Sequence, residues 1–435
     1  MLLDTRAPIF LPCAQGVEPL LAAECRALLA SAPIEERRGG VCVTAGPVEA
    51  LKLNLHSRLA QRVLWPLRGD AYRDEHDLYR AACELDWPAW ITPEQTLRVD
   101  TSAWRSPLKS LNFATLRIKD AVCDVLREQT GARPSVDTQR PHLPLVLHLG
   151  PQEFMLYVDL SGEALFKRGW RDARGGRVDV KGEAPLKETL AAAMLAAAGW
   201  QGREEDGPLL DPCCGAGTIA IEAAQMACGM APGLQRAFAF EKLAPFRPHL
   251  PDWQRLKAQA RAAVHPPRVV VHAGDVSFRM TDFAQRNAER AGVAHAIQFK
   301  TADALQRPAP AAAGVIVMNP PYGERIAPKG SGRGPDAGRA MAQGSWDEAF
   351  EQQAAASPAS LSSREHFEDG QATAFYERLA AHWKRQYAGW SAWVLTPELK
   401  LPSLMRLKES RRVPMFNGAI ECRLFRFDMV AGSAR

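Results

Sequence analysis

Four consecutive residues, Asn319, Pro320, Pro321 and Tyr322, follow the apolar run VIVM and combine groups that suit chemistry on an amine. The Asn319 amide oxygen and the Pro320 carbonyl can accept both hydrogens of an amine conjugated to a ring, which localises its lone pair for in-line attack on an electrophile. The Tyr322 ring can stack on a base turned out of its helix. The structural alternative is that the two prolines merely end a strand and Tyr322 packs in a core.

A glycine-rich run, DPCCGAGT, lies between an apolar strand and a helix and is a second candidate site. Such a turn lets the backbone approach a ligand that faces the helix N-terminus. The run has neither a GKS/GKT P-loop ending nor the GxGxxG pattern. A carboxylate at the strand end repels phosphate but can meet an ammonium or hydroxyl group, so S-adenosyl-L-methionine fits better than a dinucleotide. A plain strand-to-helix turn is the alternative. The candidate cofactor residues here are Asp211, Cys213, Gly215, Gly217 and Thr218.

Two further aspartates close predicted strands. Asp275 ends RVVVHAGD and is placed to accept hydrogen bonds from ribose hydroxyls, and Asp303 ends IQFKTAD and is placed to accept from an adenine amine. An aspartate at a strand end can instead form a turn or cap a helix. If VIVMNPPY is the strand next to the one bearing the glycine loop, Asn319 also lies beside the cofactor.

The nine cysteines show no paired CxxC spacing, which argues against a disulfide framework and a zinc site. The histidines show no metal-ligand spacing either, so we expect no metal. RNA cytosine-C5 methyltransferases use a thiolate nucleophile, but their catalytic corner carries a cysteine beside proline, whereas this corner is Asn-Pro-Pro-Tyr. Cys213 and Cys214 are therefore interpreted as loop residues.

The elements that must position these groups alternate between apolar strands and helices. The strands LLD, RVVVHAGD, IQFKTAD, VIVM and WSAWVLTPE, with helices between them, predict a parallel, doubly wound α/β sheet over residues 180–435. Asn417-Gly418 separates two alternating runs and predicts an antiparallel hairpin at the edge of that sheet. Residues 327–374 contain 30 Ala, Gly, Ser, Pro or Gln in 48 positions, which predicts a flexible insertion before a helix at FYERLAAHWKRQY.

The first part of the chain predicts two small α+β units, at residues 1–65 and 66–170. The second of these contains an alternating strand at 96–104, an amphipathic helix at 113–131 and a hairpin over 145–162. Residues 98–177 hold 13 Lys and Arg against 9 Asp and Glu, whereas residues 1–97 hold 10 against 13, so a basic surface compatible with nucleic acid is expected in the second unit.

The composition, 46% hydrophobic and 24% charged over 435 residues, suits two or three domains with their own cores. No apolar stretch approaches the roughly 20 residues of a membrane helix, and MLLDTRAPIFLPC lacks the pattern of a signal peptide. We expect a soluble, cytoplasmic protein.

These motifs together resemble the RNA guanine-N2 methyltransferases that join a ferredoxin-like unit and a THUMP domain to a class I methyltransferase domain, and among them the enzymes of 23S ribosomal RNA. The resemblance spans almost the whole chain. It rests on PCAQGVEPLLAAE, LFKRGWR, APLKETLAAAML, LLDPCCGAGTIAIEAA, QRNAERAGV, NPPYGERI and NGAIECRLFRF. It implies S-adenosyl-L-methionine as methyl donor, a guanine of 23S ribosomal RNA as substrate, and the APLKETLAAAML segment, with Lys187, over the cofactor.

The resemblance also implies that the THUMP domain binds RNA. The basic and aromatic residues that could serve this role are Lys109, Arg117, Lys119, Arg133, Arg140, Lys167, Arg168, Trp170, Arg171 and Arg174.

The chain departs from the family pattern in three places. Ser277 stands where the family often has a second acidic residue, so the division of the ribose contacts differs from the family pattern. The insertion at residues 327–374 is longer than the family pattern suggests. The guanine-N7 methylating domain that is fused to some relatives is not expected here.

Three other functions remain open. A tRNA guanine-N2 methyltransferase has the same domain order. Protein-glutamine N5 methyltransferases use the same corner, although a peptide substrate does not need the first 180 residues. A ribosome-assembly factor could keep the fold and bind RNA without turnover.

Overall fold

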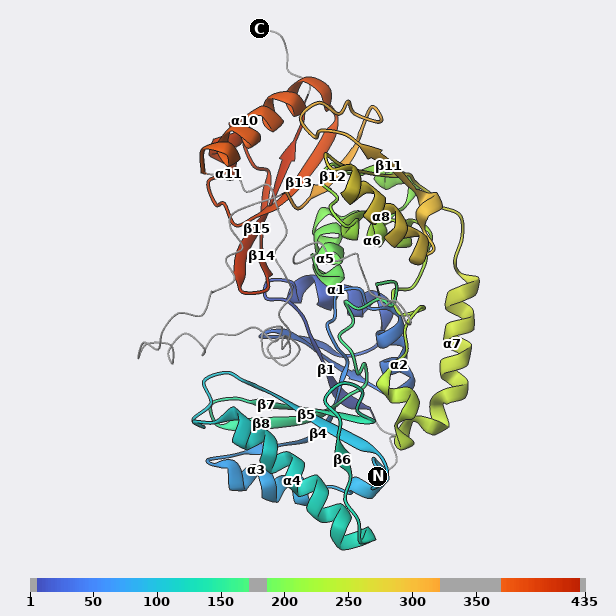
Figure 1. Ribbon diagram of the computed structural model, residues 1–435, viewed down its shortest axis with the longest axis vertical. Coiled ribbons are helices and arrows are strands. Elements are labelled where there is room, and N and C mark those ends of the chain that lie inside the picture. The colour runs from blue at the N-terminus through green and yellow to red at the C-terminus, as the bar shows by residue number, and fades with distance from the viewer. Residues whose placement is uncertain (1–5, 172–185, 321–368, 431–435) are drawn as a thin grey trace. The chain divides into compact units, whose positions relative to one another are not determined.

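The computed structural model describes residues 6–171, 186–320 and 369–430, and the chain divides into two units (Figure 1). The described part of the first unit comprises residues 6–165 and 236–258. That of the second comprises residues 166–171, 186–235, 259–320 and 369–430.

The first unit is built on one eight-stranded sheet with the order β2-β3-β1-β4-β8-β7-β5-β6. Helices α3 and α4 pack against each other and cover strands β4 and β5, while α1 packs on β2 and β3 (Figure 1). The strands are β1 (Ala7–Pro12), β2 (Ile34–Arg37), β3 (Gly40–Ala45), β4 (Leu64–Ala71), β5 (Thr96–Ala103), β6 (Ser135–Val136), β7 (Leu143–Leu149) and β8 (Glu153–Asp159). The helices are α1 (Glu18–Leu28), α2 (Pro47–His56), α3 (Glu75–Cys83), α4 (Leu111–Thr130) and the 3-10 turns η1 (Trp87–Ala89), η3 (Ala239–Lys242) and η4 (Ala244–His249).

The second unit contains a seven-stranded sheet with the order β11-β10-β9-β12-β13-β15-β14. The first five strands of this order are parallel, and β15 pairs antiparallel with both β13 and β14. The strands are β9 (Leu209–Asp211), β10 (Val271–Asp275), β11 (Ile297–Thr301), β12 (Gly314–Met318), β13 (Trp390–Thr396), β14 (Arg411–Asn417) and β15 (Ile420–Asp428). The predicted doubly wound α/β sheet with an antiparallel hairpin at its edge is confirmed.

Helices cover both faces of this second sheet. Helices α6 and α8 contact β10 and β11, and α5 contacts β12 and β13. Leu210, Ile316 and Met318 share a buried cluster with aromatic side chains of α10 such as Trp383. The helices are α5 (Glu188–Ala198), α6 (Thr218–Ala227), α8 (Phe278–Arg290), α10 (Asp369–Gln386) and α11 (Leu401–Met405), with η2 (Glu204–Asp206) and η5 (Ala294–Ala296); α7 (Leu250–Ala262) spans the division between the units.

Local sequence explains where the predicted helices end. Helix α4 starts after Ser110, whose hydroxyl accepts from the Phe113 N–H, and stops at Gly131 with φ 78°. Helix α5 stops at Gly199 with φ 74°. Both glycines occupy the left-handed region that a side chain would disfavour, so the predicted helix ends are confirmed.

The structure differs from the sequence-based division of the chain in three places. The boundary expected at residues 65/66 falls inside β4, which pairs with β1 on one side and β8 on the other. Residues 236–258, expected in the second half, belong to the first unit, where the Phe246 ring meets Trp65 edge-on at 5.7 Å. Residues 327–368 of the expected insertion lie outside the described residues, whereas its last residues, 369–374, belong to helix α10, which begins at Asp369.

Across the ranges that the structure describes, no helix is both long enough and apolar enough to span a bilayer.

Candidate active site

The carboxyl ends of three adjacent strands, β10, β9 and β12, meet at one edge of the second sheet. Asp211 is the last residue of β9, Asp275 is the last residue of β10, and Asn319 follows β12 directly. Strand β9 pairs with β10 on one side and β12 on the other, so the chain order reverses here. This switch point is where parallel α/β sheets place their ligands, and the structure brings the three predicted residues to it.

Backbone hydrogen bonds hold the glycine-rich loop against β10. The Gly215 N–H donates to the Asp275 carboxylate over 3.0 Å, and the Cys214 N–H donates to the Gly274 carbonyl over 2.7 Å. The other Asp275 oxygen accepts from the Ser277 N–H over 2.9 Å. Asp275 therefore shapes the loop, besides being a predicted ligand.

Gly217 marks a close approach between the loop and helix α8. Its φ is 86°, and a Cβ there would lie 2.9 Å from the Cβ of Ala284. From the same helix, Asn287 donates its side-chain N–H to the Ala216 carbonyl over 2.8 Å. The glycine thus lets α6 start directly behind the loop, with Thr218 as its first residue.

Two oxygens at this edge have no hydrogen-bond partner in the described part of the chain. One is Oδ2 of the buried Asp211, whose other oxygen accepts from the Cys213 N–H over 3.3 Å; the second is the buried Oδ1 of Asn319. Burial raises the pKa of Asp211 to about 8, and the charge of Asp275 adds to the rise. Buried polar atoms are normally paired, so these two suit a ligand that supplies donors, as an ammonium or amine does.

Residues 166–171 pack beside the glycine loop, within the second unit. Arg171 donates to the Thr218 hydroxyl over 2.6 Å and forms a 3.0 Å ion pair with Glu188 of α5. Burial raises the pKa of Glu188 to about 7, and Arg171 opposes that rise. Sequence reasoning missed this link because it treated Arg171 only as an RNA contact.

Two residues expected to contact RNA are buried instead. Arg168 forms a 2.9 Å ion pair with Glu222 of α6, and the two side chains are 1% and 0% exposed. Trp170 is also buried. Both side chains are therefore not exposed for the RNA contact that the sequence suggested, and Arg168 instead anchors the segment to α6.

The remaining predicted cofactor residues, Asp303 and Lys187, have less defined roles. Asp303 lies two residues beyond β11, and its carboxylate accepts from the Leu305 N–H over 2.9 Å and from the Gln306 side chain over 3.1 Å. It forms a turn, the alternative noted for such aspartates. Lys187 precedes α5, with its ammonium 5.4 Å from the centre of the Phe166 ring. Their proposed contacts with the cofactor stay predictions.

The loop thiols are poor nucleophiles in this setting. Burial raises the pKa of both the Cys213 and Cys214 thiols well above the ordinary value, and neighbouring aspartates add to the rise. A thiolate at either position is disfavoured, in line with their interpretation as loop residues.

The expected RNA contacts in the first unit are spread around helix α4. Lys109 precedes the helix and is exposed, and Arg133 and Arg140 are exposed beyond its end. Arg117 stacks 4.4 Å above the Tyr79 ring, and Lys119 pairs with Asp120 over 2.6 Å. Lys167, in the second unit, is exposed too.

Three expected site residues cannot be placed. Pro321, Tyr322 and Arg174 lie outside the described residues, whereas Pro320 is described and buried. Within the described ranges, no group of three or more His, Cys, Asp or Glu side chains is arranged to hold a metal ion.

Three family descriptions match successive parts of the chain: an RlmL ferredoxin-like domain over residues 8–64, a THUMP domain over residues 72–159, and an RMKL-like methyltransferase domain over residues 174–334. The ribosomal RNA large subunit methyltransferase K/L of Shewanella baltica (strain OS185) is 33% identical over 98% of this chain and 54% of its own length. The chain thus spans about half the length of the curated relatives that it matches.

Solved structures show the same fold. A possible methylase from Clostridium difficile 630 superimposes with a TM-score of 0.77 and 23% identity, over 99% of this chain and all of the other. The protein SMU.472, crystallised in complex with SAH, has a TM-score of 0.77 and 21% identity over the same shares. The chain therefore matches, in this order, the descriptions of an RlmL ferredoxin-like domain, a THUMP domain and an RMKL-like methyltransferase domain.

Proposed function

We propose that this chain methylates the exocyclic N2 amine of a guanine in 23S ribosomal RNA. The observation that carries the proposal is the meeting of Asp211 and Asn319 at the switch point, each with a buried oxygen that lacks a partner in the described part of the chain. Oδ2 of Asp211 suits the ammonium of the cofactor's amino acid tail, and Oδ1 of Asn319 suits a substrate amine. The name shared by the K/L relatives supports ribosomal RNA as the substrate.

The cofactor would be held by the residues around the glycine loop. Asp211 would accept from the ammonium, the loop from Cys213 to Thr218 would let the backbone approach, and Asp275 would accept from ribose while it keeps the loop in place. Asp303 and Lys187 complete the proposed set. When bound, S-adenosyl-L-methionine supplies an electrophilic methyl group on a sulfonium.

The residues after β12 would hold the amine. Oδ1 of Asn319 and the Pro320 carbonyl each accept one hydrogen, so the nitrogen lone pair is localised and directed toward the methyl group. Pro321 would restrict the backbone, and Tyr322 would stack on the base. A strong base is not needed before attack, because the nitrogen loses its proton readily once it carries positive charge.

We also propose that the ferredoxin-like and THUMP domains bind the RNA. Exposed Lys109, Arg133 and Arg140 support this role, because phosphate contacts supply most of the affinity for nucleic acid. An RNA substrate of this kind would place the activity in the cytoplasm.

The test is to incubate the protein with labelled S-adenosyl-L-methionine and RNA from a strain that lacks the gene, and then to identify the labelled nucleoside. Label in N2-methylguanosine of 23S RNA is expected. The same nucleoside in tRNA would move the proposal to a tRNA enzyme, and cofactor binding without transfer to any RNA would indicate a non-catalytic assembly factor.

The variant Asn319→Ala tests the corner itself. We expect kcat to fall on the order of 10² or more, as for the loss of one oriented polar group, while cofactor affinity stays within a few fold. Near-normal turnover with intact cofactor binding would show that Asn319 does not hold the amine.

A further inference from the structure

The loop after β11 lies against one face of the two outermost parallel strands, β10 and β11. His272 and Gly274 of β10 pair in register with Gln298 and Lys300 of β11, so these four residues share a face of the sheet. His272 is also in register with Leu210 of β9, which faces the core that α10 shares. The face therefore lies opposite α6 and α8, which contact β10 and β11.

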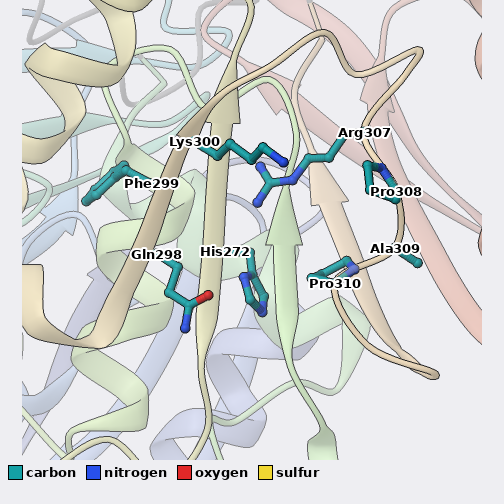
Figure 2. A pocket seen from close by; sticks show the side chains of 8 residues that line it. All are labelled: His272, Gln298, Phe299, Lys300, Arg307, Pro308, Ala309 and Pro310. Atoms are coloured by element: carbon teal, nitrogen blue, oxygen red, sulfur yellow. The ribbon is translucent and has the colours of Figure 1, made fainter.

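The loop after β11 closes a hollow of about 310 Å³ against this face, shown in Figure 2. Its lining residues are His272, Gln298, Phe299, Lys300, Arg307, Pro308, Ala309 and Pro310. The side chains of Lys300 and Arg307 extend toward each other across the strands (Figure 2).

Arg307 is held firmly at the side of this hollow. Its carbonyl accepts from Nε2 of His382 over 2.7 Å and from the Tyr387 hydroxyl over 2.9 Å, and the residue is only 6% exposed. The guanidinium passes over Gly274, where an added Cβ would overlap Nη1. A glycine at this point of β10 thus makes room for the arginine.

The charge on Arg307 is not balanced by an ion pair in the described part of the chain. Nη1 is buried there without a hydrogen-bond partner. Burial lowers the pKa of Arg307, and the electrostatic contributions of nearby groups only partly oppose that effect. A buried charge of this kind is costly unless something of opposite charge pairs with it.

The other groups around the hollow suit an anion too. Lys300 is exposed and adds a second positive charge. Burial, with a contribution from Arg307, lowers the pKa of His272 to about 4, so its imidazole is neutral near pH 7 and can donate one hydrogen bond. Gln298 can donate as well.

We propose that Arg307 and Lys300 bind a phosphate-type oxyanion in this hollow. Charge-assisted hydrogen bonds to an oxyanion would satisfy the buried guanidinium. The hollow lies beside the middle of β10 and β11, whereas the candidate active site lies beyond their carboxyl ends, so this is a second site. The phosphate group could belong to an RNA backbone or to a free phosphate compound.

The first arm of the test uses inorganic phosphate and the full chain. Calorimetric titration at fixed ionic strength is run on the unchanged protein, on Lys300→Gln and on the matched control Lys408→Gln, which removes an exposed lysine elsewhere in the second unit. We expect saturable binding that Lys300→Gln weakens roughly tenfold and Lys408→Gln leaves unchanged. Equal affinities in all three proteins, or no saturable binding, would overturn the proposal.

The second arm identifies the source of the phosphate. RNA affinity is measured over a range of salt concentrations with the same three proteins. If the RNA backbone occupies the hollow, Lys300→Gln reduces the slope of log affinity against log salt by about one and phosphate competes with RNA. If this slope is the same in all three proteins although Lys300→Gln binds phosphate more weakly, a free phosphate compound is the ligand. Only this arm rests on the proposed RNA substrate, so the two proposals can fail separately.

Discussion

The carboxylate of Asp275 accepts a hydrogen bond from the Gly215 N–H over 3.0 Å, so the residue that ends β10 holds the loop that follows β9. Its second oxygen accepts from the Ser277 N–H over 2.9 Å. One side chain thus orders both loops at the carboxyl edge of the sheet. Ser277 therefore takes part in this arrangement through its backbone N–H, and it does not supply a second carboxylate.

Replacing Asp275 tests this arrangement. In Asp275→Ala both loops lose an acceptor, and hydrogen bonds to a charged group contribute about 1.5–3 kcal/mol each, so we expect cofactor affinity to fall about ten- to hundredfold. Equilibrium binding of S-adenosyl-L-methionine measures the loss. Ser277→Ala is the control, because it keeps the backbone N–H, and it should bind normally. A comparable loss in Ser277→Ala would instead assign a cofactor contact to the Ser277 hydroxyl.

The close approach at Gly217 predicts a loss of stability. Gly217→Ala would place a side chain at φ 86° and 2.9 Å from the Cβ of Ala284, so strain and overlap add. We expect the free energy of unfolding to fall by about 2–4 kcal/mol. Gly418→Ala is the matched control: its φ is 64° and no atom lies within 4 Å of the added Cβ.

Urea unfolding, followed by tryptophan fluorescence, compares the two glycine variants. The midpoint of Gly217→Ala should drop clearly more than that of Gly418→Ala, which carries only the strain of its backbone conformation. Equal shifts in both would mean that α8 moves aside at no cost and that the contact with Ala284 does not restrict the loop.

The buried pair Arg168–Glu222 predicts a larger effect than pairs on the surface. Glu222→Ala leaves a guanidinium that is 1% exposed without its carboxylate, so we expect the free energy of unfolding to fall by about 3–5 kcal/mol. Glu421→Ala is the control, since Glu421 pairs with Arg423 at 2.6 Å but its side chain is 57% exposed, and such pairs contribute about 0–1 kcal/mol. A small effect of Glu222→Ala would show that the 166–171 segment is held mainly by its apolar contacts.

The site could be predicted from sequence largely because its residues stand at strand ends. Asp211, Asp275 and Asn319 each follow an apolar run, and parallel strands bring such positions to one edge without knowledge of the side-chain packing. The roles of Arg168 and Arg171 could not be predicted in this way. Their partners Glu222 and Glu188 lie on the later helices α6 and α5, and an arginine in a basic segment gives no local sign of which carboxylate it will pair with.

Local irregularities explain where the fold differed from prediction. Strand β4 was not predicted because Pro66 and Gly69 interrupt its alternating pattern. The structure accommodates the proline where the register with β8 shifts, between Pro66 and Arg68.

In the C-terminal hairpin, Asn417 pairs with Ile420, so the two-residue turn is Gly418-Ala419 instead of Asn417-Gly418. Gly418 has φ 64°, as the first central position of a type II′ turn requires.

The state of Asp211 makes cofactor binding depend on pH. Its pKa is about 8 in the cofactor-free protein, because burial disfavours the charged form. The ammonium of the cofactor favours the charged carboxylate, so below this pKa cofactor binding releases the proton of Asp211. The affinity for the cofactor should therefore rise with pH between about pH 6 and 7.5, by a factor that approaches about tenfold per pH unit. Above about pH 8 the rise should stop, because Asp211 is then already ionised and the cofactor's ammonium begins to lose its own proton.

Asp211→Asn separates this effect from others. The amide cannot titrate, so we expect its affinity for S-adenosyl-L-methionine to be weak and nearly constant from pH 6 to 7.5. Calorimetry in two buffers with different ionisation enthalpies should detect proton release on binding to the unchanged protein at pH 7 and little or none with Asp211→Asn. The same pH dependence in both proteins would assign the titration to another group and leave Asp211 ionised before the cofactor arrives.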